Sequence, residues 1–232
     1  MSQNLSDLRN FLKGTLDIGD YLSYSLVECE SKGCARGNKS EGIPLWLLRK
    51  ERQRRGTGVP VDLGLSVLWS SRNVGAVSGE QPGCYVGWAD TSGKKTSVRN
   101  EDYPSTEPPQ TIDGSEYDLA RQMWKETWRI PTVDEMRELI QNCRWFWTVI
   151  RGVPGYQVVG NTGNSIFLPA AGNRYGMEYE DAYYFGKYWT SQLSEKNNKM
   201  ACYLEFSQQG IDMASIARCT GLNIRPVLEK TD

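Results

Sequence analysis

One stretch of the chain alternates apolar and polar positions with the period of an α-helix. Four apolar residues recur there at spacings of three and four: Met136, Leu139, Ile140 and Cys143. Thr132 and Glu135 stand just before them at the spacing of a capping box, in which each side chain satisfies the other residue's backbone amide. The pattern predicts an amphipathic helix that begins after Thr132 and packs its apolar face on the domain core.

A second stretch, residues 200–207, alternates with the period of a β-strand. One set of side chains is predicted to face the core: Cys202, Leu204 and Phe206. The other set is predicted to face outward: Tyr203, Glu205 and Ser207. A turn at residues 208–210 leads into a further polar and apolar segment, 211–215. We therefore expect an antiparallel hairpin in this part of the chain.

The remaining pattern predicts short strands and turns between two helices. Expected strands or strand pairs lie at 61–69, 83–88, 156–159 with 166–168, and 183–189, with a first helix at 115–124 and a long polar loop at 91–110. We predict an α+β domain over residues 59–228, with small antiparallel or mixed sheets and long loops. Residues 1–58 are predicted to be an amino-terminal extension, with a short helix at 5–12 and a basic linker at 46–55.

Composition narrows the classes of function. The 27 basic and 28 acidic residues give a net charge of −1, so we expect no nucleic-acid partner. No apolar run is long enough for a transmembrane helix. No signal peptide is visible, so we expect a cytoplasmic or phage-particle location, or a surface location if a leader has been removed. The chain has no histidine, which disfavours serine–histidine and cysteine–histidine catalysis and most zinc enzymes.

The order of several motifs resembles a protein family found mostly in gut Bacteroidetes, the Fibrobacter succinogenes major paralogous domain. The matching segments are Val61–Trp69, Asn73–Gly75, Trp128–Thr132 with its helix, Gly155–Tyr156, Gly163–Gly172, Tyr188–Ser191 and Ile224–Val227. The resemblance covers about residues 59–228. It implies a C-type-lectin-like fold of the kind used by formylglycine-generating enzymes, with two main helices and neighbouring chain ends. The same fold displays the variable surface of diversity-generating retroelement proteins, including phage receptor-binding proteins.

The resemblance implies a non-catalytic recognition protein that binds a protein or glycan through residues 192–223, with no cofactor or metal. The candidate ligand-binding residues are Gln192, Tyr203, Glu205, Ser207, Asp212, Ser215, Ile216 and Arg218. Arg225, near the end of the matched region, is predicted to be structural, donating charge-assisted bonds to backbone carbonyls or a core carboxylate. A homo-oligomer is a further possibility. The Tyr183–Phe185 run could pack either at a subunit interface or in the core of the domain.

Three alternatives remain. Retroelement diversification would mark residues reachable from Asn codons by adenine changes: Ile211, Asp212, Ala214, Ser215, Ile216, Ala217, Arg218, Cys219 and Thr220. An oxidoreductase like the formylglycine-generating enzymes needs two cysteines a few residues apart, whereas Cys202 and Cys219 are distant in sequence. Calcium-dependent sugar binding needs clustered oxygens, and the only dense acidic group, Glu178 with Glu180 and Asp181, is equally typical of a solvated loop.

Overall fold

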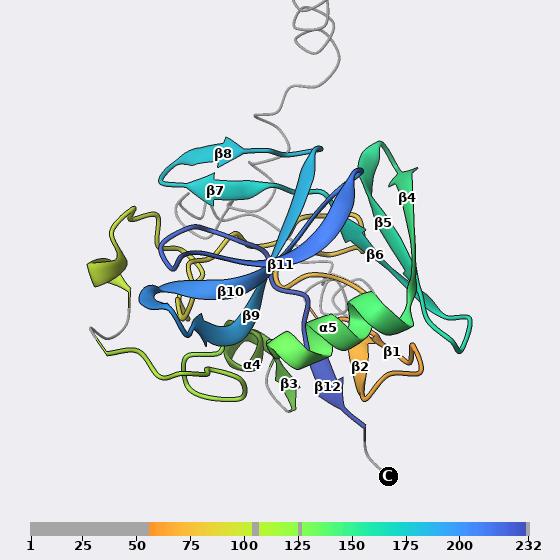
Figure 1. The fold of residues 1–232 in the computed structure, drawn as a ribbon, viewed down its shortest axis with the longest axis horizontal. Coiled ribbons are helices and arrows are strands. Elements are labelled where there is room, and N and C mark those ends of the chain that lie inside the picture. Colours follow the sequence, from red (N-terminus) through yellow and green to blue (C-terminus); the bar gives the residue numbers. More distant parts are fainter. Residues whose placement is uncertain (1–55, 104–106, 125–126, 231–232) are drawn as a thin grey trace, which may run out of the picture. The chain divides into compact units, whose positions relative to one another are not determined.

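The structure, a computed structural model, describes residues 56–103, 107–124 and 127–230. The predicted extension 1–58 lies outside these ranges except for its last three residues. The described part is an α+β domain in which strands dominate, as predicted for the class (Figure 1). No helix within the described ranges is long and apolar enough to cross a membrane.

The elements follow one another in short pieces. They are β1 (Pro60–Val61), β2 (Val67–Ser70), η1 (Asn100–Asp102), α4 (Leu119–Trp124), β3 (Trp128–Arg129), α5 (Val133–Asn142), β4 (Arg144–Ile150), β5 (Val153–Val159), β6 (Ser165–Pro169), β7 (Asn173–Tyr175), β8 (Glu178–Glu180), β9 (Phe185–Ser194), β10 (Asn197–Ser207), β11 (Gly210–Ala217) and β12 (Val227–Glu229).

These strands form four small sheets rather than one large one. The strand orders are β1-β2-β12-β3, β11-β10-β9, β4-β5-β6 and β7-β8. Every pairing between named strands within the described ranges is antiparallel. The first and last strands of the described domain lie in the same sheet, because β12 pairs with β2 on one side and β3 on the other.

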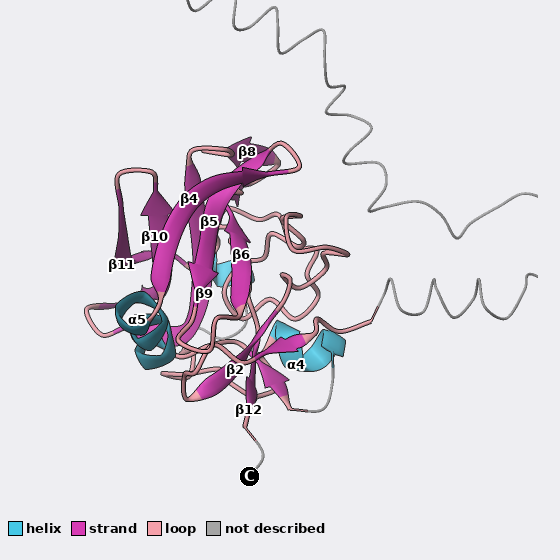
Figure 2. Ribbon diagram, turned by 90° about the vertical axis from the view of Figure 1, so that its right-hand side faces the viewer, coloured by secondary structure: helices cyan, strands magenta, loops and turns pink. Residues whose placement is uncertain are grey.

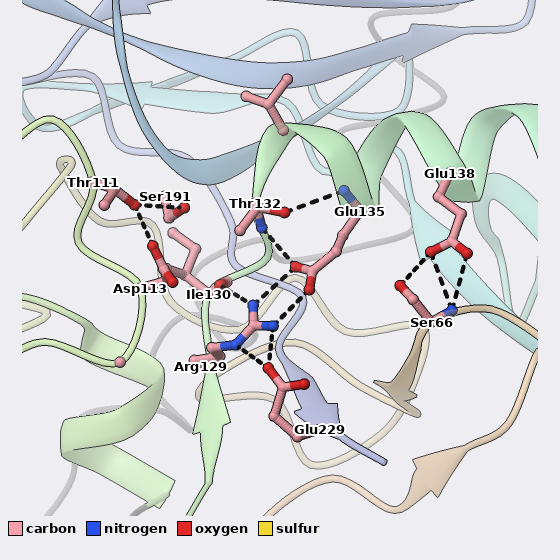
Figure 3. A network of polar contacts seen from close by, with 12 residues as sticks. Ser66, Thr111, Asp113, Arg129, Ile130, Thr132, Glu135, Glu138, Ser191 and Glu229 are labelled. Atoms are coloured by element: carbon pink, nitrogen blue, oxygen red, sulfur yellow. Dashed lines mark hydrogen bonds and ion pairs between the residues drawn. The ribbon is translucent and has the colours of Figure 1, made fainter.

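Helix α5 begins where the sequence predicts. The Glu135 amide donates to Thr132 Oγ1 at 3.2 Å, and the Thr132 amide donates to Glu135 Oε2 at 2.8 Å, so the capping box is complete (Figure 3). Two residues of the apolar face, Met136 and Leu139, are buried in the core. The capping box therefore fixes the helix start and the packing face together.

Arg129 ties the start of α5 to the closing strand β12. Its guanidinium donates to both Glu135 carboxylate oxygens, one at 2.8 Å, and to Glu229 (Figure 3). The hydrogen bonds that Arg129 donates to Glu135 raise the pKa of its guanidinium. Burial opposes ionisation of Glu135, yet the Arg129 and Thr132 donors hold its pKa below the ordinary value of 4.5. The bidentate geometry makes this a strong, oriented ion pair.

Several predicted elements differ from the structure. The first helix begins at Leu119 rather than 115, because the buried Asp118 carboxylate accepts from the amides of Ala120 and Arg121 and so caps it later. The segment 83–88 forms only an isolated bridge, between Val86 and Leu222. Strand β4 has no counterpart among the predicted strands. Its Trp145 and Trp147 rings pack edge-on against Tyr156 of β5.

The β9–β10–β11 sheet lies between two hydrophobic clusters. On one face Trp189 and Tyr203 join a cluster that includes Trp88, while on the other Tyr188 and Phe206 join a second cluster. When both faces of a strand pack against the core, consecutive residues of that strand are buried. The predicted hairpin is confirmed, with Tyr203 opposite Ala214 and Leu204 opposite Met213. Its expected inward-and-outward alternation is wrong at the strand centre.

Buried arginines join distant segments. Arg225 is fully buried and donates to the Ser70 carbonyl at 3.0 Å, the Phe167 carbonyl at 2.7 Å and Asn73 Oδ1 at 2.8 Å. The predicted structural role of Arg225 is confirmed in its backbone-carbonyl form. Arg174 of β7 likewise connects distant segments, because its guanidinium donates to the carbonyls of Gly176, Tyr85 and Lys95.

Candidate functional site

The eight residues predicted to bind ligand do not share one surface. They lie along β9, β10, β11 and the turn after β11, on a sheet whose two faces both meet the core. Figure 1 shows this sheet crossing the middle of the described domain, and Figure 2 shows β10 and β11 running side by side. Each predicted residue therefore has to be located by its own contacts.

Tyr203 is buried, which corrects its predicted outward position. Its side chain is 6% exposed, and its ring packs edge-on against Trp189 with centroids 6.2 Å apart. The phenol hydroxyl donates to Glu205 Oε2 at 2.9 Å. Burial, together with this bond to a carboxylate, raises the pKa of Tyr203. Tyr203 is thus a neutral donor that orients Glu205 rather than a contact residue.

Arg218 is also buried, at 3% exposure, against its predicted outward position. Its amide donates to the Lys199 carbonyl at 3.0 Å, and its own carbonyl accepts from the Trp88 amide at 2.8 Å. Burial lowers the pKa of the guanidinium. The backbone here ties the turn after β11 to the loop around Trp88. Because the side chain is buried, replacing it would leave a cavity or a clash and so disturb the fold.

Gln192 serves the helix rather than a ligand in this structure. Its Oε1 accepts from the backbone amide of Val133, the first residue of α5. The first amides of a helix have no partner within the helix, so a side-chain acceptor at this point completes the cap. The half-buried Gln192 therefore joins β9 to α5, and its role in ligand binding stays a prediction.

The other hairpin positions divide between the two faces. Ser215 pairs with Cys202 across the strands, on the face opposite Glu205, with the two side chains 3.7 Å apart. Ile216 is half-buried and packs against the first core cluster. Ser207, at the end of β10, donates to Gln209 Oε1 at 2.8 Å. Ser215 therefore lies away from Glu205 and Ile216 packs into the core, whereas Ser207 shares the face of Glu205 two residues along β10.

Glu205 and Asp212 do lie together, and a lysine that sequence reasoning missed joins them. Lys187 of β9, Glu205 of β10 and Asp212 of β11 are direct cross-strand neighbours, which places them on one face of the sheet. We call these three residues the charged row. Neighbouring side chains in such a row have Cβ atoms about 5 Å apart. Lys187 Nζ lies 3.9 Å from the Glu205 carboxylate.

The Lys187 ammonium makes its shortest contacts away from Glu205, with Asp181 and Asn173. The Lys187 side chain is 10% exposed, and its ammonium donates to Asp181 Oδ2 at 2.7 Å and to Asn173 Oδ1 at 2.8 Å. Asn173 in turn donates to Glu180 Oε2 at 3.0 Å. These bonds connect the charged row to β7 and β8. The signal that could have found Lys187 is its parity with Trp189, since side chains two apart on a strand share a face.

The segment next to the charged row exposes a group of large side chains. Within residues 175–184, five are exposed: Tyr175, Met177, Tyr179, Tyr183 and Tyr184. The interpretation of Tyr183 and Tyr184 as core residues is therefore wrong. We call these five side chains the tyrosine face; across the β7–β8 ribbon, Tyr179 lies on the same side as Arg174, and Tyr175 lies on the other side with Glu178. The acidic group at 178–181 reaches the charged row through Asp181, which pairs with Lys187.

Cofactor and thiol chemistry find little support in the described residues. No group of three His, Cys, Asp or Glu side chains in these ranges is arranged to hold a metal ion. Burial raises the pKa of Cys84, Cys143 and Cys219, which holds these thiols in the protonated, less nucleophilic form. Asp181 with Lys187 forms an ion pair instead of an oxygen cluster for calcium.

Comparison of the chain with protein-family models, with curated proteins and with solved structures finds no match.

Proposed function

We propose that the domain is a non-catalytic recognition module on a C-type-lectin-like scaffold, similar to the Fibrobacter succinogenes major paralogous domain. The carrying observation is where the motif residues lie. Asn73, Phe167 and Arg225 come from three distant matched segments and meet in one buried hydrogen-bond network. The closing strand beside the first strands also agrees with the neighbouring ends that this fold implies.

The exposed chemistry lies outside those motifs. The charged row and the tyrosine face combine aromatic side chains with adaptable polar groups, the composition typical of recognition surfaces. Most of the polar contacts there come from strands, which hold the groups in a fixed arrangement. A rigid scaffold with a polar and aromatic surface supports binding of a protein or a glycan more than it supports group transfer.

A selection experiment tests the proposal. The full chain is immobilised and exposed to a random peptide display library and, separately, to an array of oligosaccharides. We expect a reproducible ligand whose binding falls at least about tenfold, roughly 1.4 kcal/mol, in Asp212→Lys. Phe146→Ser, a change at an exposed apolar side chain of β4, should leave binding unchanged. Failure of both collections to give a ligand would contradict a recognition role.

Retroelement diversification is the second candidate, and the structure limits where it could act. Arg218, Cys219 and Thr220 are buried, so random replacement there would damage the fold. Residues 211–217 are exposed or half-buried and tolerate change better. The test is in the neighbouring DNA: a reverse-transcriptase gene and a near-copy of codons 192–223 that differs only at adenines. We expect such differences to concentrate in codons 211–217.

A further inference from the structure

The exposed apolar side chains of the described domain are unevenly distributed. Eleven large ones are exposed in all, and the five of the tyrosine face fall within ten residues. Met177 is 78% exposed and Tyr184 is 73% exposed. Scattered exposed apolar residues need no explanation, but several in one short segment with acidic neighbours are a candidate interaction site. Figures 1 and 2 both place β8 at the end of the domain away from α5 and β12.

The backbone under the tyrosine face is held in place. The Arg174 guanidinium fixes the β7–β8 turn through the Gly176 carbonyl at 2.6 Å, and the Tyr85 ring packs edge-on against Tyr179 with centroids 5.0 Å apart. Tyr183 has a φ of 71°, a left-handed conformation that is strained for a non-glycine residue. Its amide is held by the Ala170 carbonyl at 2.7 Å. The face is thus preorganised for contact.

Carboxylates border the tyrosines. Glu178 and Glu180 lie on β8, and Asp181 follows directly. Glu205 and Asp212 face each other across β10 and β11, an arrangement of like charges that destabilises a sheet. Lys187 is the one basic residue of the charged row, and Asp181 already engages it. Lys95, whose carbonyl meets Arg174, instead turns its ammonium to the Tyr103 ring and the Asp102 carbonyl.

The exposed tyrosine rings and the neighbouring carboxylates together favour a ligand that carries a positive charge. A guanidinium or ammonium group placed over a tyrosine ring gains cation–π attraction. The same group would relieve the repulsion between Glu205 and Asp212 if it reached the end of the charged row. A sugar would also stack on the rings, but a neutral sugar would leave that carboxylate pair uncompensated.

We propose that the tyrosine face and the adjoining carboxylates bind an arginine- or lysine-bearing segment of a partner protein. This inference rests on the recognition role proposed above and specifies the chemistry of its partner. Tyr183 and Tyr184 provide the aromatic contacts, and Asp212 provides the charge contact. Tyr203 and Lys187 hold Glu205 in position from the buried side.

The test uses the full chain and defined probes. Three fluorescent peptides of equal length, (Arg-Gly-Ser) repeats, (Gln-Gly-Ser) repeats and (Glu-Gly-Ser) repeats, are titrated by anisotropy. We expect the arginine peptide to bind at least about tenfold more tightly than the glutamine peptide, and the glutamate peptide not to bind. The affinity for the arginine peptide should fall as salt is raised, because the exposed charges are screened.

Variants locate the contact. Tyr183→Ser combined with Tyr184→Ser should lower affinity for the arginine peptide by about tenfold or more, and Asp212→Asn should lower it severalfold. The matched control, Phe146→Ser combined with Val149→Ser, removes two exposed apolar side chains of β4 and should change nothing. Circular dichroism of each variant establishes that it is folded before its affinity is compared.

Two results would overturn the inference. One is equal binding of the arginine and glutamine peptides, or arginine binding that survives the tyrosine changes. The other is an oligosaccharide ligand that depends on Tyr183 and Tyr184 while no cationic peptide binds, which assigns the face to glycans and leaves the recognition role intact. Absence of any ligand in the library and array selections would instead count against the recognition role itself.

Discussion

Arg129 and Lys187 each lie among carboxylates contributed by different elements, but the two surroundings differ. Arg129 is engaged on both sides, by Glu135 of α5 and Glu229 of β12. Lys187 is engaged mainly on one side, by Asp181, and beyond Glu205 the charged row ends at the exposed Asp212. Similar residue types thus hold a scaffold together in one place and leave a negative charge facing solvent in the other.

The difference lies in what each cation is connected to. The arginine network joins a helix start and a closing strand, so its loss would separate parts of the fold. The lysine lies under a surface segment, and the carboxylate farthest from it has only local contacts, through the Met213 amide at 2.7 Å. Removing the charge of Glu135 beside Arg129 should therefore lower the free energy of unfolding, whereas removing the charge of Asp212 should raise it.

The largest loss is expected from Arg225→Ala, in the scaffold itself. The change removes the donors of three buried acceptors, the Ser70 and Phe167 carbonyls and Asn73 Oδ1, and leaves a cavity. We expect the free energy of unfolding to fall by about 3–5 kcal/mol, measured by urea unfolding with tryptophan fluorescence. Arg225→Lys should recover part of it. A loss below about 1 kcal/mol would contradict the role assigned to these bonds.

Glu135→Gln should cost about 2 kcal/mol at neutral pH, because Arg129 loses its bidentate partner. The effect should depend on pH. The pKa of Glu135 is lower in the folded protein than its ordinary value of 4.5, so its contribution is present above 4.5 and is lost as pH falls through the folded value. Unfolding curves of both proteins should converge below pH 4.5. A constant difference would contradict the ion pair as the cause.

Thr132→Ala should lower the free energy of unfolding by ~1 kcal/mol, because the Glu135 amide loses its acceptor. Thr132→Ser keeps the hydroxyl and is the matched control. Affinity for any ligand of the tyrosine face should stay nearly unchanged in both. A large affinity loss in a folded Thr132→Ala protein, read by the same peptide titration, would move the binding site to the helix.

The smallest effect is a gain. Asp212→Asn should raise the free energy of unfolding by ~0.2–0.5 kcal/mol, because it removes the like-charge contact with Glu205 while keeping an oxygen for the Met213 amide. The gain should shrink in high salt. Asp134→Asn is the comparison: this exposed carboxylate lies in the first turn of α5 and pairs with Arg137, so its removal should destabilise. Destabilisation by Asp212→Asn would refute the repulsion.

The features that the sequence predicted correctly depend mainly on residues close together in the chain. The capping box of Thr132 and Glu135 depends on residues three apart, so it could be read directly. The hairpin of β5 and β6 and the pairing of β10 with β11 follow from alternation and turn residues. Arg225 as a structural residue came from its place in a family pattern, and its partners agree.

The candidate site was harder because it depends on contacts between distant segments. Tyr203 alternates with Leu204, and only the second cluster on the far side of the sheet explains why both are buried. Gln192 is polar and is predicted to bind ligand, but its side-chain oxygen accepts a hydrogen bond from the first amide of α5. Lys187, 18 residues before Glu205 in the printed sequence, becomes its neighbour only through strand pairing.

The position of β12 has a consequence for how the protein is made. Val227 pairs with both Trp69 and Arg129, so the sheet that contains the earliest strands is completed by nearly the last described residues. Contacts between residues so far apart in sequence form slowly, and during synthesis they must wait until β12 has emerged from the ribosome. Until then β2 and β3 lack the strand that lies between them. We therefore expect this sheet to form only after β12 has been synthesised, late among the folding steps of the domain.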